Sequence, residues 1–304
     1  MRYGAMLDVS QDIDGVIAQV TAQRDAGFTT AWSPQIFGYD ALTLLAVVGR
    51  AVPDIELGTA VVPTYPRHPL MLAAQALTTQ AATGGRLVLG IGLSHQIVIE
   101  GIFGYSFDRP ARHMREYLSA LLPGLRGEQV SFEGETLKAN TFGPLDVKGV
   151  TQPPVLLAAL APVMLRLAGR FADGTVTWMT GPATVGGHIV PSITTAAEKA
   201  GRPAPRVVVG LPVAVTADAD GAREQAARAF ALYGTLPSYR AMLDREGAEG
   251  PADVAIVGDE EAVAKGIQTV VDAGATDFLA APFGSRDDQQ RTVALLADRA
   301  RSAA

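Results

Sequence analysis

The stretch TGGRLVLGIG, residues 83–92, decides the fold. Two glycines end a helical stretch, and an almost continuously apolar run, RLVLGIG (86–92), follows at once. Glycine just past a helix end supplies the left-handed backbone conformation that turns the chain. An apolar run without alternation is typical of a strand that is covered on both faces, as in a parallel sheet. The stretch therefore predicts a helix followed by a buried strand.

The same pattern recurs along the chain. Gly27, Gly174 and Gly274 each close a helical stretch just before another apolar run. Eight parallel strands with helices between them are the count of a (β/α)8 TIM barrel, with a doubly wound open sheet as the alternative. We predict the barrel, as a single domain over residues 1–304. The eight predicted strands are YGAML (3–7), TTAWS (29–33), IELGTAVV (55–62), RLVLGIG (86–92), PVLLAAL (154–160), TVTWM (175–179), VVVGLPVAV (207–215) and DFLAA (277–281).

Two stretches are too long for simple connections between strand and helix. Residues 93–153 contain a helix candidate, PARHMREYLSALLPGL, and a polar hairpin-like segment, EQVSFEGETLKAN. Residues 217–252 contain two helical stretches around Gly234 and Pro237. Long connections in a compact domain usually serve as lids or binding loops. We predict that both are insertions at the carboxyl-terminal face of the barrel, with oligomer contact as the alternative.

Composition excludes several classes of function. The net charge is −6 without a basic run, which disfavours nucleic acid and an anionic membrane surface as partners. The chain has no cysteine, and its four histidines are far apart without carboxylates at metal-ligand spacing, so we expect no metal site. The N-terminus lacks an apolar core with a cleavage site, so we expect no signal peptide and a cytoplasmic location.

Residues that follow the predicted strands are expected to face a ligand, because barrel active sites lie at the strands' carboxyl ends. Asp8, Gln35, Gly92 to His95, Ala159 to Pro162 and Trp178 to Pro182 hold these places. The set is apolar and rich in glycine, with few ionisable groups and no lysine for Schiff-base chemistry. Such a mouth suits a flat aromatic cofactor that is held partly by backbone groups.

Several segments together resemble the luciferase-like monooxygenase superfamily, and within it the branch that uses the deazaflavin coenzyme F420. They cover nearly the whole chain, and their order and spacing are more specific to the superfamily than any single segment is. They are AGFTTAW, IELGTAVVPTYPRHP, AAQALTTQAATGGRLVLGIGLSH, REYLSALLPGLRGEQVSFEGETL, PPVLLAALAPVMLRLAGRFADGTVTWMTGP and GDEEAVAKGIQTVVDAGATDF.

The resemblance implies positions for the cofactor. The family's third strand carries a bulge with a cis non-proline peptide behind the ring system, which predicts a cis bond between Ala60 and Val61; the alternative is a plain buried strand. The loop after the fifth strand holds the coenzyme's phosphate, and the loop after the sixth strand lies beside the ring. The predicted cofactor-binding residues, including those placed by the strand ends, are Asp8, Thr59, Ala60, Val61, Gly92, Ser94, Ala159, Leu160, Ala161, Trp178, Met179 and Gly181.

Two departures from the family's sugar-phosphate dehydrogenases point to the chemistry. Those enzymes carry a His after the second strand and a Glu after the fourth, where this chain has Gln35 and His95. We therefore expect a different substrate and predict His95 and Gln35 as the catalytic residues, since an imidazole exchanges protons near neutral pH. We predict that the protein is an F420-dependent oxidoreductase that acts on a small molecule, and that it forms a homodimer. The alternatives are an FMN-dependent monooxygenase and a non-catalytic flavin-binding protein.

Overall fold

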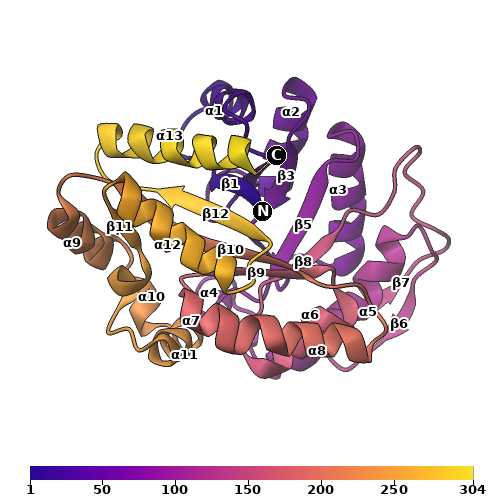
Figure 1. Cartoon of the computed structure of the whole chain (residues 1–304). Coiled ribbons are helices and arrows are strands. Elements are labelled where there is room, and N and C mark those ends of the chain that lie inside the picture. The colour runs from indigo at the N-terminus through magenta and orange to yellow at the C-terminus, as the bar shows by residue number, and fades with distance from the viewer. Residues whose placement is uncertain (304) are drawn as a thin grey trace. The chain divides into compact units, whose positions relative to one another are not determined.

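The computed structural model describes residues 1–303, and Figure 1 labels most of its helices and strands. The chain divides into two compact units, which we describe separately. The first unit consists of Met1–Leu7, Thr21–Trp32 and Ala159–Ala304. The second unit consists of Asp8–Val20 and Ser33–Ala158, so helix α1 (Ile13–Asp25) contributes residues to both.

The first unit is built on parallel strands in the order β9-β10-β12-β1-β2, with β11 also beside β10. The longest strand, β10, pairs along its length with β12, from Val208 opposite Asp277 to Val213 opposite Pro282. The strands are β1 (Arg2–Met6), β2 (Thr30–Ser33), β9 (Gly174–Trp178), β10 (Arg206–Val215), β11 (Ile256–Gly258) and β12 (Asp277–Pro282). The helices are α6 (Pro162–Phe171), α7 (Pro182–Thr184), the π-helix η1 (Val185–Ile189), α8 (Val190–Lys199), α9 (Ala219–Ala229), α10 (Ala231–Thr235), α11 (Pro237–Glu246), the 3₁₀ helix η2 (Pro251–Val254), α12 (Glu260–Asp272) and α13 (Arg286–Ser302).

The second unit has a shorter parallel sheet in the order β3-β5-β8, with β4 pairing β5 farther along the same strand. A separate antiparallel hairpin pairs β6 with β7. The strands are β3 (Glu56–Thr59), β4 (Val62–Pro63), β5 (Leu87–Gly92), β6 (Ser131–Glu133), β7 (Lys138–Asn140) and β8 (Val155–Leu157). The helices are α2 (Ala41–Ala51), α3 (Pro69–Ala82), α4 (Gln96–Gly101) and α5 (Pro110–Leu125).

Strands and helices follow one another along the chain as in a (β/α)8 barrel, which confirms the predicted fold class. Every residue of β5 is buried, and so is every residue of β2 and β8, as the continuous apolar runs predicted. Full burial of an aliphatic side chain such as Leu89 or Ile91 contributes about 1.5–3 kcal/mol. The predicted helix at 110–125 is α5, and the hairpin-like segment forms β6 and β7. The single-domain assignment stays a prediction.

Three details differ from the sequence-based expectations. The run 55–62 is not one strand but two, β3 and β4, separated at Ala60 and Val61. Strand β11 was not predicted, because it has only three residues. Gly27 and Gly274 do turn the chain with positive φ, but Gly174 is the first residue of β9. A Cβ at Gly174 would lie 2.0 Å from the carbonyl oxygen of Arg206, so close strand packing explains that glycine.

Candidate active site

The bulge between β3 and β4 is the most tightly fixed part of the candidate site in the second unit. The peptide bond between Ala60 and Val61 is cis, as predicted. The buried Thr59 hydroxyl donates to the carbonyl of Gly90 at 2.7 Å and accepts from the amide of Gly90 at 2.9 Å. The amide of Ala60 donates to the carbonyl of Ser33 at 2.9 Å. The bulge is therefore bonded both to β5 and to the last residue of β2.

Glycines on β5 make room for this bulge. A Cβ at Gly90 would lie 2.0 Å from the carbonyl oxygen of Thr59, and a Cβ at Gly92 would lie 2.8 Å from the side chain of Val61. Both distances are shorter than any side chain tolerates, so only glycine fits. The Gly90-Ile91-Gly92 sequence thus serves close packing of two strands, and the structure brings the bulge residues Thr59 and Val61 against β5. Their predicted contact with a cofactor stays a prediction.

His95 lies just beyond the carboxyl end of β5. Ser94 has positive φ (61°) and turns the chain, and His95 then forms the N-cap of α4. Its carbonyl accepts from the amides of Val98 and Ile99, both at 2.9 Å. The side chain is half-buried, and burial lowers the pKa of His95 below its usual value. At neutral pH the imidazole is therefore uncharged, the form that can accept a proton.

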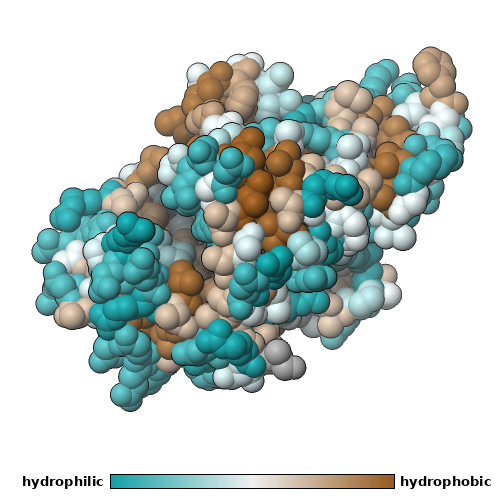
Figure 2. Space-filling view, turned by 90° about the horizontal axis from the view of Figure 1, so that it is seen from above, coloured by the Kyte–Doolittle hydropathy of each residue, from teal (hydrophilic) through white to brown (hydrophobic). Residues whose placement is uncertain are grey.

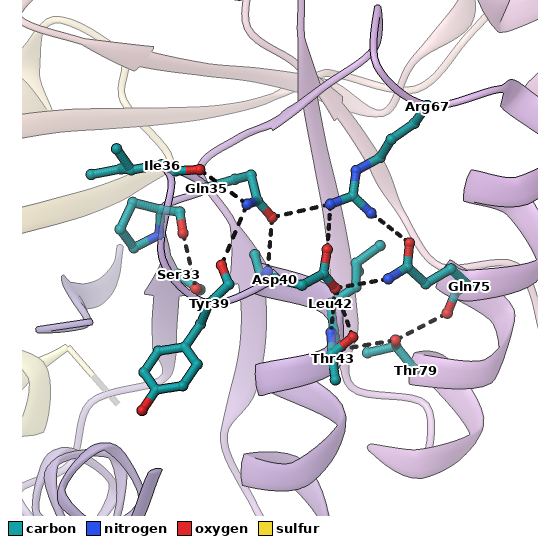
Figure 3. Close-up of polar contacts among 12 residues, drawn as sticks. Ser33, Gln35, Ile36, Tyr39, Asp40, Leu42, Thr43, Arg67, Gln75 and Thr79 are labelled. Carbon is teal, nitrogen blue, oxygen red and sulfur yellow. Dashed lines mark hydrogen bonds and ion pairs between the residues drawn. The ribbon is translucent and has the colours of Figure 1, made fainter. Parts of the chain in front are cut away.

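Gln35 is part of a polar network that Figure 3 shows in close-up. Its Oε1 accepts from the amide of Ala41 at 2.8 Å and from Arg67 at 3.3 Å. Its Nε2 donates to the carbonyls of Ile36 and Tyr39, both at 3.3 Å. Both ends of the side chain are therefore engaged in holding the loop 34–40 in place. Its predicted catalytic role stays a prediction.

Arg67 and Asp40 form the centre of the same network (Figure 3). Arg67 pairs with Asp40 and donates to Gln75 at 2.6 Å, and Gln75 donates to Asp40 at 2.7 Å. Asp40 also caps α2 by accepting from the amide of Thr43 at 2.9 Å. Burial alone would raise the pKa of Asp40, but hydrogen bonds from Arg67 and Thr43 outweigh it and lower the pKa. Asp40 thus stays ionised and joins α2 and α3 to the loop.

Asp8 lies in an exposed turn after β1. Its Oδ1 accepts from the amide and the hydroxyl of Ser10, at 3.1 and 2.5 Å. Its backbone amide donates to Gln19 at 3.0 Å. These bonds are those of a local turn, and the predicted contact of Asp8 with a cofactor stays a prediction.

In the first unit, Ala159, Leu160 and Ala161 lead from β8 into α6. Ala161 is the N-cap of this helix and makes no capping hydrogen bond with its side chain. Ala161 is exposed, and a helix N-terminus favours an anion. The π-helix η1 adds His188, whose Nε2 donates to the carbonyl of Leu160 at 2.8 Å. His188 therefore fixes the loop that was predicted to bind phosphate.

Trp178, Met179 and Gly181 follow β9. Trp178 contacts Phe230 and Tyr233 edge-on, with ring centroids 6.0 and 6.1 Å apart. Its indole Nε1 is buried and has no hydrogen-bond partner among the residues that the structure describes. Met179 is fully buried and has positive φ (52°), and Gly181 is the N-cap of α7. The unpaired indole N–H is a donor that a bound ligand's oxygen could satisfy.

Sequence reasoning missed Glu246, at the end of α11. Its two carboxylate oxygens accept from the amides of Ala183 and Thr184, at 3.0 and 2.7 Å. A Cβ at Gly181 would lie 2.3 Å from this carboxyl group. Glu246 thus joins the 217–252 insertion to the loop after β9. No local sequence signal reveals this, because the partners are more than sixty residues apart.

Within residues 1–303, no three or more His, Asp or Glu side chains are arranged to hold a metal ion. Nor does this part of the chain contain a helix that is both long and apolar enough to cross a membrane.

Comparison with known proteins places this geometry in context. A family model described as luciferase-like monooxygenase matches residues 1–277. The chain is 29% identical to the 5,10-methylenetetrahydromethanopterin reductase of Methanolobus tindarius over 269 residues, which are 88% of this chain and 80% of the relative. It is 33% identical to a putative coenzyme F420-dependent oxidoreductase of Mycobacterium tuberculosis over 185 residues, 55% of this chain and 52% of the relative.

Solved structures share the fold. The coenzyme F420-dependent tetrahydromethanopterin reductase of Methanopyrus kandleri matches with a TM-score of 0.81 and 23% identity, over 97% of each chain. The oxygenating component of a diketocamphane monooxygenase of Pseudomonas putida, in complex with FMN, matches with a TM-score of 0.76 and 16% identity, over 98% of this chain and 96% of the other. At such identities the two structures show the fold alone.

Proposed function

The chain belongs to the luciferase-like monooxygenase family, and from this premise we propose that it is an oxidoreductase dependent on coenzyme F420. In this proposal it transfers a hydride between the deazaflavin and a small organic substrate. The observation that carries the proposal is the similarity to a reductase and to a putative F420-dependent oxidoreductase. The similarity to the reductase covers 88% of the chain.

The residues after the strands fit such a cofactor in their chemistry. The exposed, uncapped start of α6 and the loop Ala159–Ala161 would hold the phosphate through backbone amides, with His188 fixing the loop. The unpaired N–H of Trp178 is a donor suited to an oxygen of the ring system. When bound, the deazaflavin would supply or accept the hydride.

His95 would handle the proton. Burial keeps its imidazole uncharged at neutral pH, so it can accept the proton of a substrate hydroxyl when the neighbouring C–H bond gives up its hydride. In the reverse direction, the protonated imidazole of His95 would return that proton to the substrate oxygen. Gln35, held by Ala41 and Arg67, is the second proposed catalytic residue and would orient the polar group of the substrate.

The test is a comparison of F420 and FMN binding by the same purified protein. We expect F420 to bind with a dissociation constant in the micromolar range or below, and FMN to bind more weakly. Tight retention of FMN without binding of F420 would instead favour an FMN-dependent monooxygenase.

A further inference from the structure

Exposed apolar side chains gather on two short segments of the second unit. The surface in Figure 2 is mostly hydrophilic, and hydrophobic side chains appear there in a few separate areas. Half of the exposed large apolar side chains in the described part of the chain belong to the loop after β2 or to α4 and the loop after it. We call them the apolar lip: Ile36, Phe37, Ile97, Ile102, Phe103 and Tyr105.

The two segments meet. The rings of Phe37 and Phe103 have centroids 6.3 Å apart and planes inclined by 37°. Phe37 is nevertheless 65% exposed, and Ile36 and Ile97 are 62% and 67% exposed. Each such side chain forgoes most of the stabilisation that burial would bring. Exposed apolar side chains gathered on two segments that touch in this way mark a site of interaction.

The lip is held in place from behind. The Gln35, Asp40 and Arg67 network fixes the loop that carries Ile36 and Phe37 (Figure 3). Ile36 and Phe37 are therefore exposed on a loop that is held in place, as expected for a preorganised binding surface.

The second segment is anchored as well. Phe107 stacks on Tyr65 at 5.3 Å, and Tyr65 stacks on His113 at 3.9 Å. The amide of Phe107 donates to the carboxylate of Glu100 at 3.2 Å, and the amide of Tyr105 donates to the carbonyl of Ile99 at 3.0 Å. Both halves of the lip thus rest on ordered polar and aromatic contacts.

The lip continues directly from the candidate catalytic residues. Ile36 is the next residue after Gln35, and Ile97 comes two residues after His95, at the start of α4. We propose that the lip is the substrate subsite and that it binds the apolar part, alkyl or aryl, of a small organic substrate. This inference rests on the proposed function for the identity of the reacting groups.

A small molecule fits the lip better than a second copy of the chain does. Stable protein interfaces engage roughly 20–30 residues on each side. The lip has six side chains on two short segments. An apolar group of a few carbon atoms, by contrast, needs only a small set of apolar lining side chains.

The experiment measures how affinity depends on the length of an apolar chain. A series of 2-alkanones from four to nine carbons is titrated calorimetrically into the protein, alone and saturated with F420. For the wild type, affinity should rise about fourfold per methylene until the lip is covered. The double variant Phe37→Ser/Phe103→Ser should lose most of this dependence, and so should Ile97→Ser/Ile102→Ser. Phe142→Ser, at an exposed Phe outside the lip, should retain it.

Each outcome decides the proposal. Equal chain-length dependence in the wild type and both double variants overturns it, and so does the absence of any dependence with or without F420. A dimer in sedimentation that dissociates in the double variants, while alkanone binding is unchanged, assigns the lip to a second copy of the chain and also overturns it. If F420 fails to bind but the variants still abolish chain-length dependence, the proposed cofactor fails and the apolar subsite stands.

Discussion

His95 is the single residue on which the proposed chemistry depends most. Its half-buried ring lies outside the core, so His95→Ala should leave the melting temperature nearly unchanged. Loss of a general base or acid should lower turnover by about 10²–10⁴-fold. His95→Gln should bind the cofactor normally and be equally slow. Steady-state rates followed by F420 absorbance measure this, and full turnover by His95→Ala would remove the residue from the mechanism.

His113 couples stability to pH. Burial lowers the pKa of this ring to about 4, although the nearby Glu116 raises it slightly. The unfolded chain takes up the proton near pH 6.5, so stability is complete above that pH and falls as the pH drops toward 4. We expect a loss of roughly 2–3 kcal/mol over this range, which His113→Phe should largely abolish. Denaturant unfolding at pH 7 and pH 4.5 checks it, and equal losses in both proteins would refute the assignment.

Side-chain partners could be predicted from the sequence only where they are local. Gly92 ends one apolar run and Ser94 and His95 follow it, and the structure places all three at the carboxyl end of β5, as the run predicted. The partners of His188 and Glu246 were not predicted. His188 bonds to a backbone carbonyl 28 residues away, and Glu246 bonds to backbone amides more than sixty residues away. The two ends of Gln35 are engaged by backbone and by Arg67, 32 residues away, which no local pattern reveals.

At the scale of elements, the contact between the β3–β4 bulge and β5 determines the shape of the site. Gly90→Ala would place a Cβ 2.0 Å from the carbonyl oxygen of Thr59. We expect a loss of about 3 kcal/mol or more in the free energy of unfolding. Gly101→Ala, where nothing lies within 4 Å, is the matched control and should change stability by less than about 1 kcal/mol. Equal effects of the two substitutions would contradict the packing described.

The 217–252 insertion is joined to α7 by the carboxylate of Glu246 and by a hydrogen bond from the Thr184 hydroxyl to the carbonyl of Met242 at 3.2 Å. Glu246→Ala removes the acceptor of the Ala183 and Thr184 amides and should lower the free energy of unfolding by about 1–2 kcal/mol. Glu249→Ala, whose side chain is exposed on the same insertion, should be neutral. Thermal unfolding compares the two. Faster proteolysis within 217–252 should accompany the first substitution only, and its absence would show that other contacts hold the insertion.

The elements that sequence predicted best are the buried strands, since a strand covered on both faces reads as an uninterrupted apolar run. The sequence predicted poorly the strands that depend on pairing with a neighbouring strand. One of these is β11, which has three residues and pairs with the end of β10. The division of 55–62 into β3 and β4 was not expected, although the family resemblance predicted a bulge with a cis bond within this run. Apolarity alone predicts one strand there, because Ala60 and Val61 are as apolar as their neighbours.

For the whole molecule, fold and family are established, and the choice of cofactor is the central proposal. Proteins that share the fold use different ring systems: one of the solved structures is described as coenzyme F420-dependent and another is in complex with FMN. The fold alone therefore does not select between F420 and FMN, and we propose that the loops after β8 and β9 make this selection.

The most direct measurement is the pair of dissociation constants for F420 and FMN, determined on one preparation of cofactor-free protein in one buffer. F420 is followed by quenching of its fluorescence and FMN by calorimetry. The account predicts a dissociation constant for F420 in the micromolar range or below, and a weaker one for FMN. Binding of FMN at least as tight as that of F420, or no binding of F420 at all, would contradict it.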